Sequence, residues 1–314
     1  MSTVPVPTQA KPERAPTRSG VRRGALAMLI PVVLLALVLG VYPIGRGIWL
    51  GFTNERTGGV YGVARTRFVG LDNFVSIFGD AAFVQGLTLM LVIAAVVVVT
   101  TYTLAYLQAM LLNQEFPFRR VVRTIVLLPM AVAPVVVGQV FRYLYDPSTG
   151  SVNGLLTSLG LVREPEFLPS SSLKWFWIAI PAVWMALPVA TLFLLAAIQN
   201  VPDELLEAAT LDGAGPLGRF RYVTFPATRG ALAAILPLSF AAQMLAFELF
   251  FALFGGQLGS VSSAGLLVPS VYGYYDLTRG LPGRAAATGT VILAVILIAF
   301  LVSRYISLRE ERKG

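Results

Sequence analysis

Glu248 is the residue whose type and position in this sequence best suit ligand chemistry. It directly follows an uncharged stretch, residues 230–247. An ionisable group within an apolar span is costly, so it normally faces the interior of a helix bundle or a water-filled cavity. A carboxylate in such a cavity accepts strong hydrogen bonds from hydroxyl groups. A second interpretation is equally compatible with the sequence: Glu248 lies hydrated at the end of its helix and has a structural role.

Three other polar side chains are candidates for the same ligand path. Gln243 would lie about 140° from Glu248 on one continuous ideal helix, so the two would flank a wide polar sector. Gln139 lies in another apolar stretch, and either glutamine is also suited to a hydrogen bond with a neighbouring helix. Tyr272, one of three nearby tyrosines, offers a ring for stacking on a ligand, although an aromatic belt at a membrane interface explains it equally well.

Several kinds of chemistry are excluded. The sequence contains no Cys and no His, which removes disulfides, thiol catalysis, the usual zinc sites and His-based triads. It also lacks a Gly-x-x-x-x-Gly-Lys-[Ser/Thr] loop. The stretch Gly213–Gly218 matches Gly-x-Gly-x-x-Gly, but a dinucleotide site needs a strand before that loop. An amphipathic helical pattern precedes it here and Pro216 interrupts it, so we expect no catalytic residue, metal site or nucleotide site in this chain.

The elements that would position these residues are long apolar helices. The chain has 314 residues, of which 56% are hydrophobic and 13% charged, and its mean hydropathy is +0.75. A soluble domain usually carries about 25% charged residues. Six uncharged runs approach or exceed the ~20 residues that cross a bilayer. They are residues 24–45, 81–114, 124–141, 175–202, 230–247 and 285–303. These runs predict an all-α polytopic membrane protein with six transmembrane helices.

The net charge of +8 does not indicate a nucleic-acid partner, because the basic residues gather where they would lie on one side of a membrane. Most of them precede the first run, separate the second from the third, follow the fourth or follow the sixth. The positive-inside tendency makes that side cytoplasmic and places both termini there. The chain then divides into a disordered basic cytoplasmic tail (1–24), a first transmembrane helix (25–50), an external segment (51–82), a five-helix core (83–306) and a cytoplasmic tail (307–314).

The segment from Pro202 to Pro226 is polar and charged in an otherwise apolar chain. Pro202 suits the first position of a helix, and Asp203 and Glu204 place negative charge at the positive end of its macrodipole. Leucines and alanines supply an apolar stripe, and Gly213 suits the end of the helix. From this local pattern alone, an ordinary amphipathic surface helix is the simplest interpretation.

The longer pattern in this segment resembles the EAA loop of membrane subunits in ATP-binding-cassette importers. It comprises Glu207-Ala208-Ala209, Gly213 after three more residues, and Val223-x-Phe225-Pro226. In that family the loop forms a short cytoplasmic helix that docks into a cleft on the ATPase. The resemblance therefore implies coupling to an ATPase through Glu207, Ala208, Ala209, Asp212 and Gly213.

Other motifs are similar to those of carbohydrate-importer permeases, in particular the first permease of maltose- and glycerol-phosphate-type importers. They are Tyr42-Pro43, Phe68-Val-Gly-Leu-Asp-Asn-Phe74, Arg123-Thr124 with Leu128-Pro129, the Asp146-Pro-x-x-Gly-x-x-Asn153 loop, and Phe247-Glu248 with Gly255-Gly256. Two stretches depart from the family pattern. At the first, the family often has a Pro where this chain has Arg229-Gly230. At the second, the family commonly has Thr-x-Gly-Gly-Pro where this chain has Leu253-Phe254-Gly255-Gly256-Gln257, in the region near the substrate path.

The resemblance implies a type I importer transmembrane domain that works by alternating access on a sugar or sugar-like solute. This subunit would hold no cofactor, because the partner ATPase binds ATP and Mg. Its partners would be a second homologous permease, two ATPase subunits, an extracytoplasmic solute-binding protein and membrane lipid. One alternative is a permease for a non-sugar solute such as a glycerol-phosphate-type compound. Another is an ion-coupled secondary transporter, which would need inverted repeats or several intramembrane acids that are not visible here.

The charge distribution makes a prediction about topology. Reporter tags at the N-terminus, near residue 215 and at Gly314 should be cytoplasmic, whereas tags near residues 60, 160 and 270 should be external. Accessibility of each tag in intact cells measures this directly. A single tag on the opposite side would contradict the six-span arrangement.

Overall fold

The computed structural model describes residues 29–55, 66–161, 173–254 and 266–311. The predicted tail, 1–24, and the Gly/Ser-rich stretch that contains Gly255-Gly256 lie outside these residues. The chain forms two compact units, residues 1–49 and 50–314. The described part of the first unit is helical from Leu29, with a π-helical turn, η1 (Leu37–Val41), that continues into α2 (Tyr42–Gly51). This agrees with the predicted first transmembrane helix.

The second unit is built from helices, together with an isolated bridge between Thr53 and Phe68. The helices are α3 (Asp72–Phe78), α4 (Ala81–Asn113), α5 (Arg119–Leu127), η2 (Leu128–Ala131), α6 (Pro134–Leu144), α7 (Ser151–Ser158), α8 (Lys174–Gln199), α9 (Asp203–Leu211), α10 (Pro216–Arg219), η4 (Phe220–Thr224), α11 (Phe225–Met244), α12 (Glu248–Leu253), α14 (Pro269–Thr278) and α15 (Pro282–Glu311).

Among the described residues, five helices are long and apolar enough to cross a membrane. They are Leu29–Gly51, Ala81–Asn113, Lys174–Gln199, Pro216–Met244 and Pro282–Arg309. The third predicted span is instead a bent pair, Arg119–Ala131 with Pro134–Leu144, whose axes differ by 94°. Pro129 lies in η2 just before this break, and Pro134 begins α6 just after it. Proline removes a backbone donor and disfavours helix at the residue before it, which accounts for the interruption. Five of the six predicted spans are thus present as single helices, and a sharply bent pair of helices stands in place of the third.

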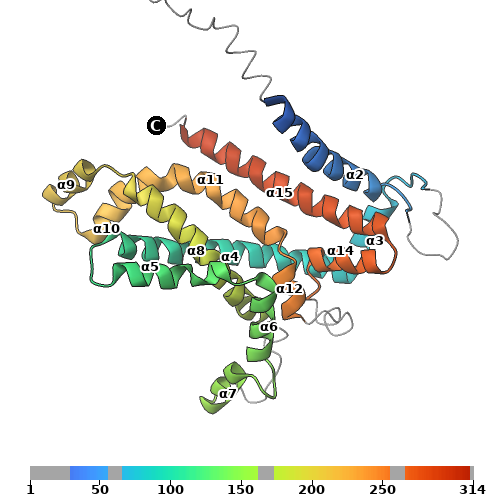
Figure 1. Cartoon of the computed structure of the whole chain (residues 1–314), viewed down its shortest axis with the longest axis horizontal. Helices are drawn as coiled ribbons and strands as arrows, with labels where there is room; N and C mark the ends of the chain where they lie inside the picture. Colours follow the sequence, from blue (N-terminus) through green and yellow to red (C-terminus); the bar gives the residue numbers. More distant parts are fainter. Residues whose placement is uncertain (1–28, 56–65, 162–172, 255–265, 312–314) are drawn as a thin grey trace, which may run out of the picture. The chain divides into compact units, whose positions relative to one another are not determined.

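Helices α4 and α8 pack against each other, with α8 crossing α4 obliquely (Figure 1). Small side chains line the contact and are almost fully buried: Ala94, Ala105 and Ala109 on α4, with Ala182 and Ala190 on α8. Such residues let two backbones approach, which is how helices associate where the surrounding lipid removes the hydrophobic driving force. The large apolar side chains of the same helices that point outward are free to face lipid.

Polar side chains also join the helices. Tyr102 and Tyr106 of α4 bond to Ser239 (2.7 Å) and Thr228 (2.6 Å) of α11, hydroxyl to hydroxyl. Thr191 of α8 donates to Gln108 Oε1 of α4 at 2.8 Å. Because hydrocarbon offers no hydrogen-bonding partner, these polar groups are satisfied between helices and hold α11 and α8 at a set rotation against α4.

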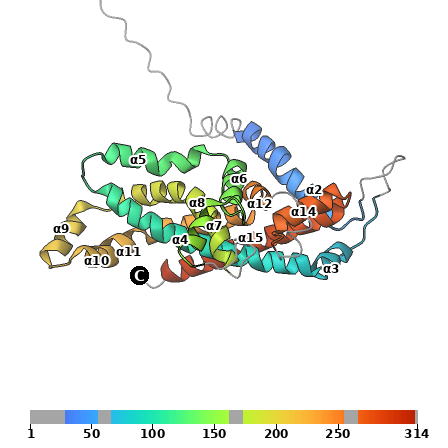
Figure 2. The ribbon, with the colours of Figure 1, turned by 90° about the horizontal axis from the view of Figure 1, so that it is seen from below.

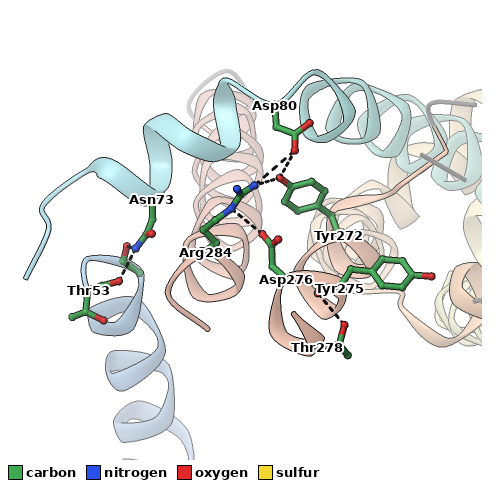
Figure 3. A network of polar contacts seen from close by, with 9 residues as sticks. Thr53, Asn73, Asp80, Tyr272, Tyr275, Asp276, Thr278 and Arg284 are labelled. Carbon is green, nitrogen blue, oxygen red and sulfur yellow. Dashed lines mark hydrogen bonds and ion pairs between the residues drawn. The ribbon is translucent and has the colours of Figure 1, made fainter. Parts of the chain in front are cut away.

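At the other end of α4 an ion-pair network joins three elements (Figure 3). Arg284 of α15 lies 3.2 Å from Asp276 of α14 and 3.7 Å from Asp80, the residue that caps α4. Arg284 also donates to the hydroxyl of Tyr272, which donates to Asp80 Oδ2 at 2.7 Å. Burial raises the pKa of the Asp276 carboxyl, an effect that the nearby arginine cations oppose. The network therefore stabilises α14 and α15 against the start of α4.

The motif from Asp146 to Asn153 has a structural explanation. The Asp146 carboxylate accepts hydrogen bonds from the backbone and hydroxyl groups of Ser148 and Thr149, which lower its pKa to about 2. Asn153 donates to the carbonyls of Tyr145 (2.8 Å) and Asp146 (3.0 Å). A Cβ at Gly150 would lie 2.5 Å from the Asp146 carbonyl oxygen. The loop is thus a self-contained connection between α6 and α7, whose positions in the unit are visible in Figure 2.

Helix α6 packs on α12 through Gly138. A Cβ on this glycine would lie 2.6 Å from both the Ala252 Cβ atom and the Leu249 carbonyl oxygen. The contact therefore requires glycine and sets the position of α12, which begins at Glu248.

This contact predicts the effect of adding one methyl group. Gly138→Ala should lower the free energy of unfolding by about 1–3 kcal/mol, because the helices must separate to admit it. The measurement is the thermal midpoint of the detergent-purified protein. Gly154→Ala is the matched control, since Gly154 is a helical glycine with nothing within 4 Å of its missing Cβ. Equal midpoints for the two variants would contradict the α6–α12 contact.

Candidate functional site

Glu248 lies at the start of a helix of its own. Helix α11 ends at Met244, Leu245 is its C-cap, and α12 begins at Glu248. The prediction that Gln243 and Glu248 lie 140° apart on one helix is therefore wrong. The chain breaks between them, because the Leu245 and Ala246 amides bond back to the end of α11 while α12 starts a new ladder.

Both residues nevertheless line one cavity, of about 510 Å³. It lies among α4, α8, α11 and the start of α12, and Pro134 of α6 also contributes to its wall. Glu248 is the one charged residue among the described residues that line this cavity, and no Lys or Arg is present in that lining. Glu248 is exposed in the isolated chain, so its carboxylate is available to a molecule in the cavity.

Three hydroxyl groups add to the polar lining. Tyr102 and Ser239 bond to each other, and each hydroxyl keeps capacity for another bond. Thr101 is only 2% exposed, and its Oγ1 has no hydrogen-bond partner among the described residues. Because this oxygen is buried, the accessible polar groups of the wall are those of Tyr102, Ser239, Gln243 and Glu248.

An aromatic group stands beside Glu248. The Phe247 ring lines the cavity, and its centroid lies 5.1 Å from that of Phe251 and 5.2 Å from that of Tyr274. Flat apolar faces next to a carboxylate and an amide suit a ligand with alternating C–H and O–H groups.

The other two candidates for the path are placed elsewhere. Gln139 is exposed on α6 and is not part of the cavity wall. Tyr272 is 5% exposed, and its hydroxyl is bonded to Asp80 and Arg284, so the expected stacking on a ligand is not available (Figure 3). Its ring packs on Phe83 instead, with centroids 5.2 Å apart. Sequence position alone could not separate this buried tyrosine from the more exposed Tyr274.

The charged segment after α8 forms the short helix α9, as predicted. Pro202 is its N-cap rather than its first residue, so the prediction was one position early. The helix ends in a Schellman motif: the Ala214 amide donates to the Ala209 carbonyl (2.9 Å) and the Gly213 amide to the Thr210 carbonyl (3.0 Å). Gly213 has φ +82°, a value that favours glycine. The spacing from Ala209 to Gly213 is therefore the spacing of a helix end.

The surface of α9 and the following turn is both charged and apolar. Glu207 lines a shallow pocket with Asp203, Arg219 and three further residues, and it is exposed. Leu211 is 89% exposed and Leu217 is 78% exposed. Large apolar side chains on a segment that also carries charges are typical of a protein-interaction site.

The Gly213–Gly218 stretch lies between α9 and α10, and Pro216 is the first residue of α10. No strand precedes it among the described residues, so the exclusion of a dinucleotide loop is consistent with the observed elements. The residues that sequence reasoning missed are Thr101, Tyr102 and Ser239. Each lies in an apolar helix with no local motif, so only the packing of α4 on α11 identifies them.

Comparison with known proteins supplies the family. Residues 101–312 match the model of the "Binding-protein-dependent transport system inner membrane component" family. The trehalose/maltose transport system permease protein MalF of Thermococcus litoralis is 29% identical over 281 residues, covering 88% of this chain and 92% of MalF. The sn-glycerol-3-phosphate transport system permease protein UgpA of Escherichia coli O157:H7 is 27% identical over 284 residues, covering 88% and 91%.

Two solved structures share the fold. One is a bacterial ABC transporter involved in the import of the acidic polysaccharide alginate, with a TM-score of 0.74, 23% identity, and coverage of 93% of this chain and 98% of the other. The second is the alginate transporter in complex with its alginate pentasaccharide-bound periplasmic protein, with a TM-score of 0.74, 24% identity, and coverage of 93% and 97%.

The family match extends from the middle of α4 to the end of α15 and so includes most of the cavity lining, α9 and the helix that follows it. This chain belongs to the family of inner-membrane components of binding-protein-dependent transport systems.

Proposed function

We propose that this chain is one of two permease subunits of an ATP-driven importer for a sugar or a glycerol-phosphate-type solute. The observation that carries the proposal is the family match across residues 101–312, supported by the names of the relatives, which are permeases for trehalose/maltose and for glycerol phosphate. The chain would lie in the inner membrane with both termini in the cytoplasm. It would perform no chemistry itself, and ATP and Mg would be bound by the partner ATPase.

Coupling to the ATPase would occur through α9. Three exposed side chains support this assignment: Glu207, Leu211 and Leu217. Together they present a carboxylate and two large apolar side chains to a complementary cleft. Ala208 and Ala209 keep the helix narrow, while Asp212 and Gly213 end it. The remaining partners would be a second homologous permease, a second ATPase copy and an extracytoplasmic solute-binding protein.

Alternating access would depend on the helix that follows α9. Residues Pro216–Met244 form one helix of 29 residues, about 43 Å long, that begins beside α9 and carries Ser239 and Gln243 at its far end. A displacement of α9 by the ATPase would therefore reach the cavity through a rigid element. The π-helical turn at Phe220–Thr224 and the internal Pro237 are points where this helix departs from regular hydrogen bonding.

Charge reversal on α9 tests the coupling. Glu207→Arg should reduce solute uptake and ATPase stimulation at least tenfold while the chain still enters the membrane, because attraction to a basic cleft becomes repulsion. Uptake and ATPase rates in proteoliposomes provide the measurement. Glu115→Arg, the same charge change on the exposed link after α4, should leave both rates near wild type. Normal rates for Glu207→Arg would rule out this docking surface.

Neutralising the cavity carboxylate tests the solute path. Glu248→Gln retains the shape and one acceptor, but a neutral hydrogen bond is weaker than a charge-assisted one by about 1 kcal/mol, so the apparent KM for uptake should rise about fivefold. Basal ATPase activity and assembly should be unchanged. Asp72→Asn, at an exposed carboxylate outside the cavity, is the control. Normal uptake by Glu248→Ala, or its failure to assemble, would assign Glu248 a structural role instead.

A further inference from the structure

We propose that the solute accepted by this chain's cavity carries no negative charge, and that Glu248 is the residue that excludes anions. This inference rests on the proposed function and names the solute class for the same cavity: an uncharged polyhydroxylated molecule rather than a phosphate or carboxylate.

The charges of the cavity wall carry the argument. Glu248 supplies a negative charge, and no described residue of the lining supplies a positive one. An anion entering a space walled mainly by apolar side chains gives up hydration and meets a like charge that water screens poorly. An uncharged solute meets the same carboxylate as a strong hydrogen-bond acceptor.

Two arginines of the surrounding helices are placed elsewhere. Arg229 lines a different hollow, between α4, α11 and α15, which shares only Val98 and Tyr102 with the cavity of Glu248. Arg284 is already paired with Asp276 and Asp80. The first position of α12, where the helix dipole favours negative charge, is occupied by Glu248 itself.

The remaining polar groups suit an uncharged polyol. Tyr102 and Ser239 form a hydroxyl pair with spare capacity, and Gln243 offers both an amide donor and a carbonyl acceptor. Anion sites in proteins use arginine, lysine or backbone N–H groups at helix ends instead. Because relatives of this chain are named for both neutral and anionic solutes, overall similarity leaves the class open, and the cavity lining selects between them.

The absence of Cys from the sequence makes a direct test possible. Ala246→Cys places one thiol in the cavity wall, between α11 and Glu248, and Ser158→Cys places a reference thiol on the exposed surface of α7. In the assembled transporter, each thiol is treated with a neutral hydroxyethyl and an anionic sulfonatoethyl methanethiosulfonate. Labelling of this chain is followed by mass. The anionic-to-neutral rate ratio at Ala246→Cys should be at least about fivefold below the ratio at Ser158→Cys.

Changing the charge of Glu248 in the Ala246→Cys background should raise the anionic-to-neutral rate ratio. Glu248→Gln should bring the ratio up to the Ser158→Cys value, and Glu248→Lys should raise it above that value. The inference is overturned if the wild-type cavity shows no discrimination, if Glu248→Gln leaves the discrimination intact, or if the neutral reagent does not reach the thiol. Slower labelling in the presence of trehalose 6-phosphate but not of trehalose would also overturn it.

This labelling pattern does not depend on ATP coupling. A failure of the proposed transport function would appear as no ATP-dependent uptake by the reconstituted wild-type transporter, with the charge discrimination still present. A failure of the inference alone would appear as lost discrimination in a transporter whose uptake still depends on Glu207.

Discussion

The close contact between α4 and α8 is the interaction on which the rest of the second unit depends. Alanines on both helices allow the backbones to approach, and the other faces of α4 then bind α11, α14 and α3. Side-chain contacts also stabilise both ends of α4. Asp80 caps its start within the Arg284 network, while Arg119 and Arg123 donate to the Leu112 carbonyl near its end, at 2.8 and 3.1 Å. A single long helix thus sets the positions of the elements at both ends.

The cavity forms where helices packed on this scaffold are interrupted. One break separates α11 from α12, and another separates η2 from α6 beside Pro134. Irregular backbone at membrane depth is tolerated only where protein buries it or where it lines a water-filled space. The Gly138 contact between α6 and α12 brings the two breaks together. Glu248 follows the first of these breaks, and Gln243 lies one residue before the end of α11.

The proposed mechanism connects this cavity to α9 through a continuous helix. The ATPase-binding helix α9 would lie next to one end of the helix Pro216–Met244, and Gln243 of the cavity wall lies at its other end. The hydroxyl pairs from Tyr102 and Tyr106 to this helix hold it against α4. In the proposed mechanism, any rocking of the helix must accommodate or break these bonds.

The sequence by itself determined the fold class, five of the long apolar helices and the helix α9. Uncharged runs of sufficient length have few alternatives to transmembrane helices, and the spacing from Ala209 to Gly213 is set by the local geometry of a helix end. Only the tertiary structure decided which polar residues share a site. It broke the presumed helix between Gln243 and Glu248, buried Tyr272 in an ion-pair network, and brought Thr101 and Ser239 to the cavity from separate helices. Periodicity reports the faces of one helix at a time, whereas a site between helices depends on packing contacts that join residues far apart in the chain.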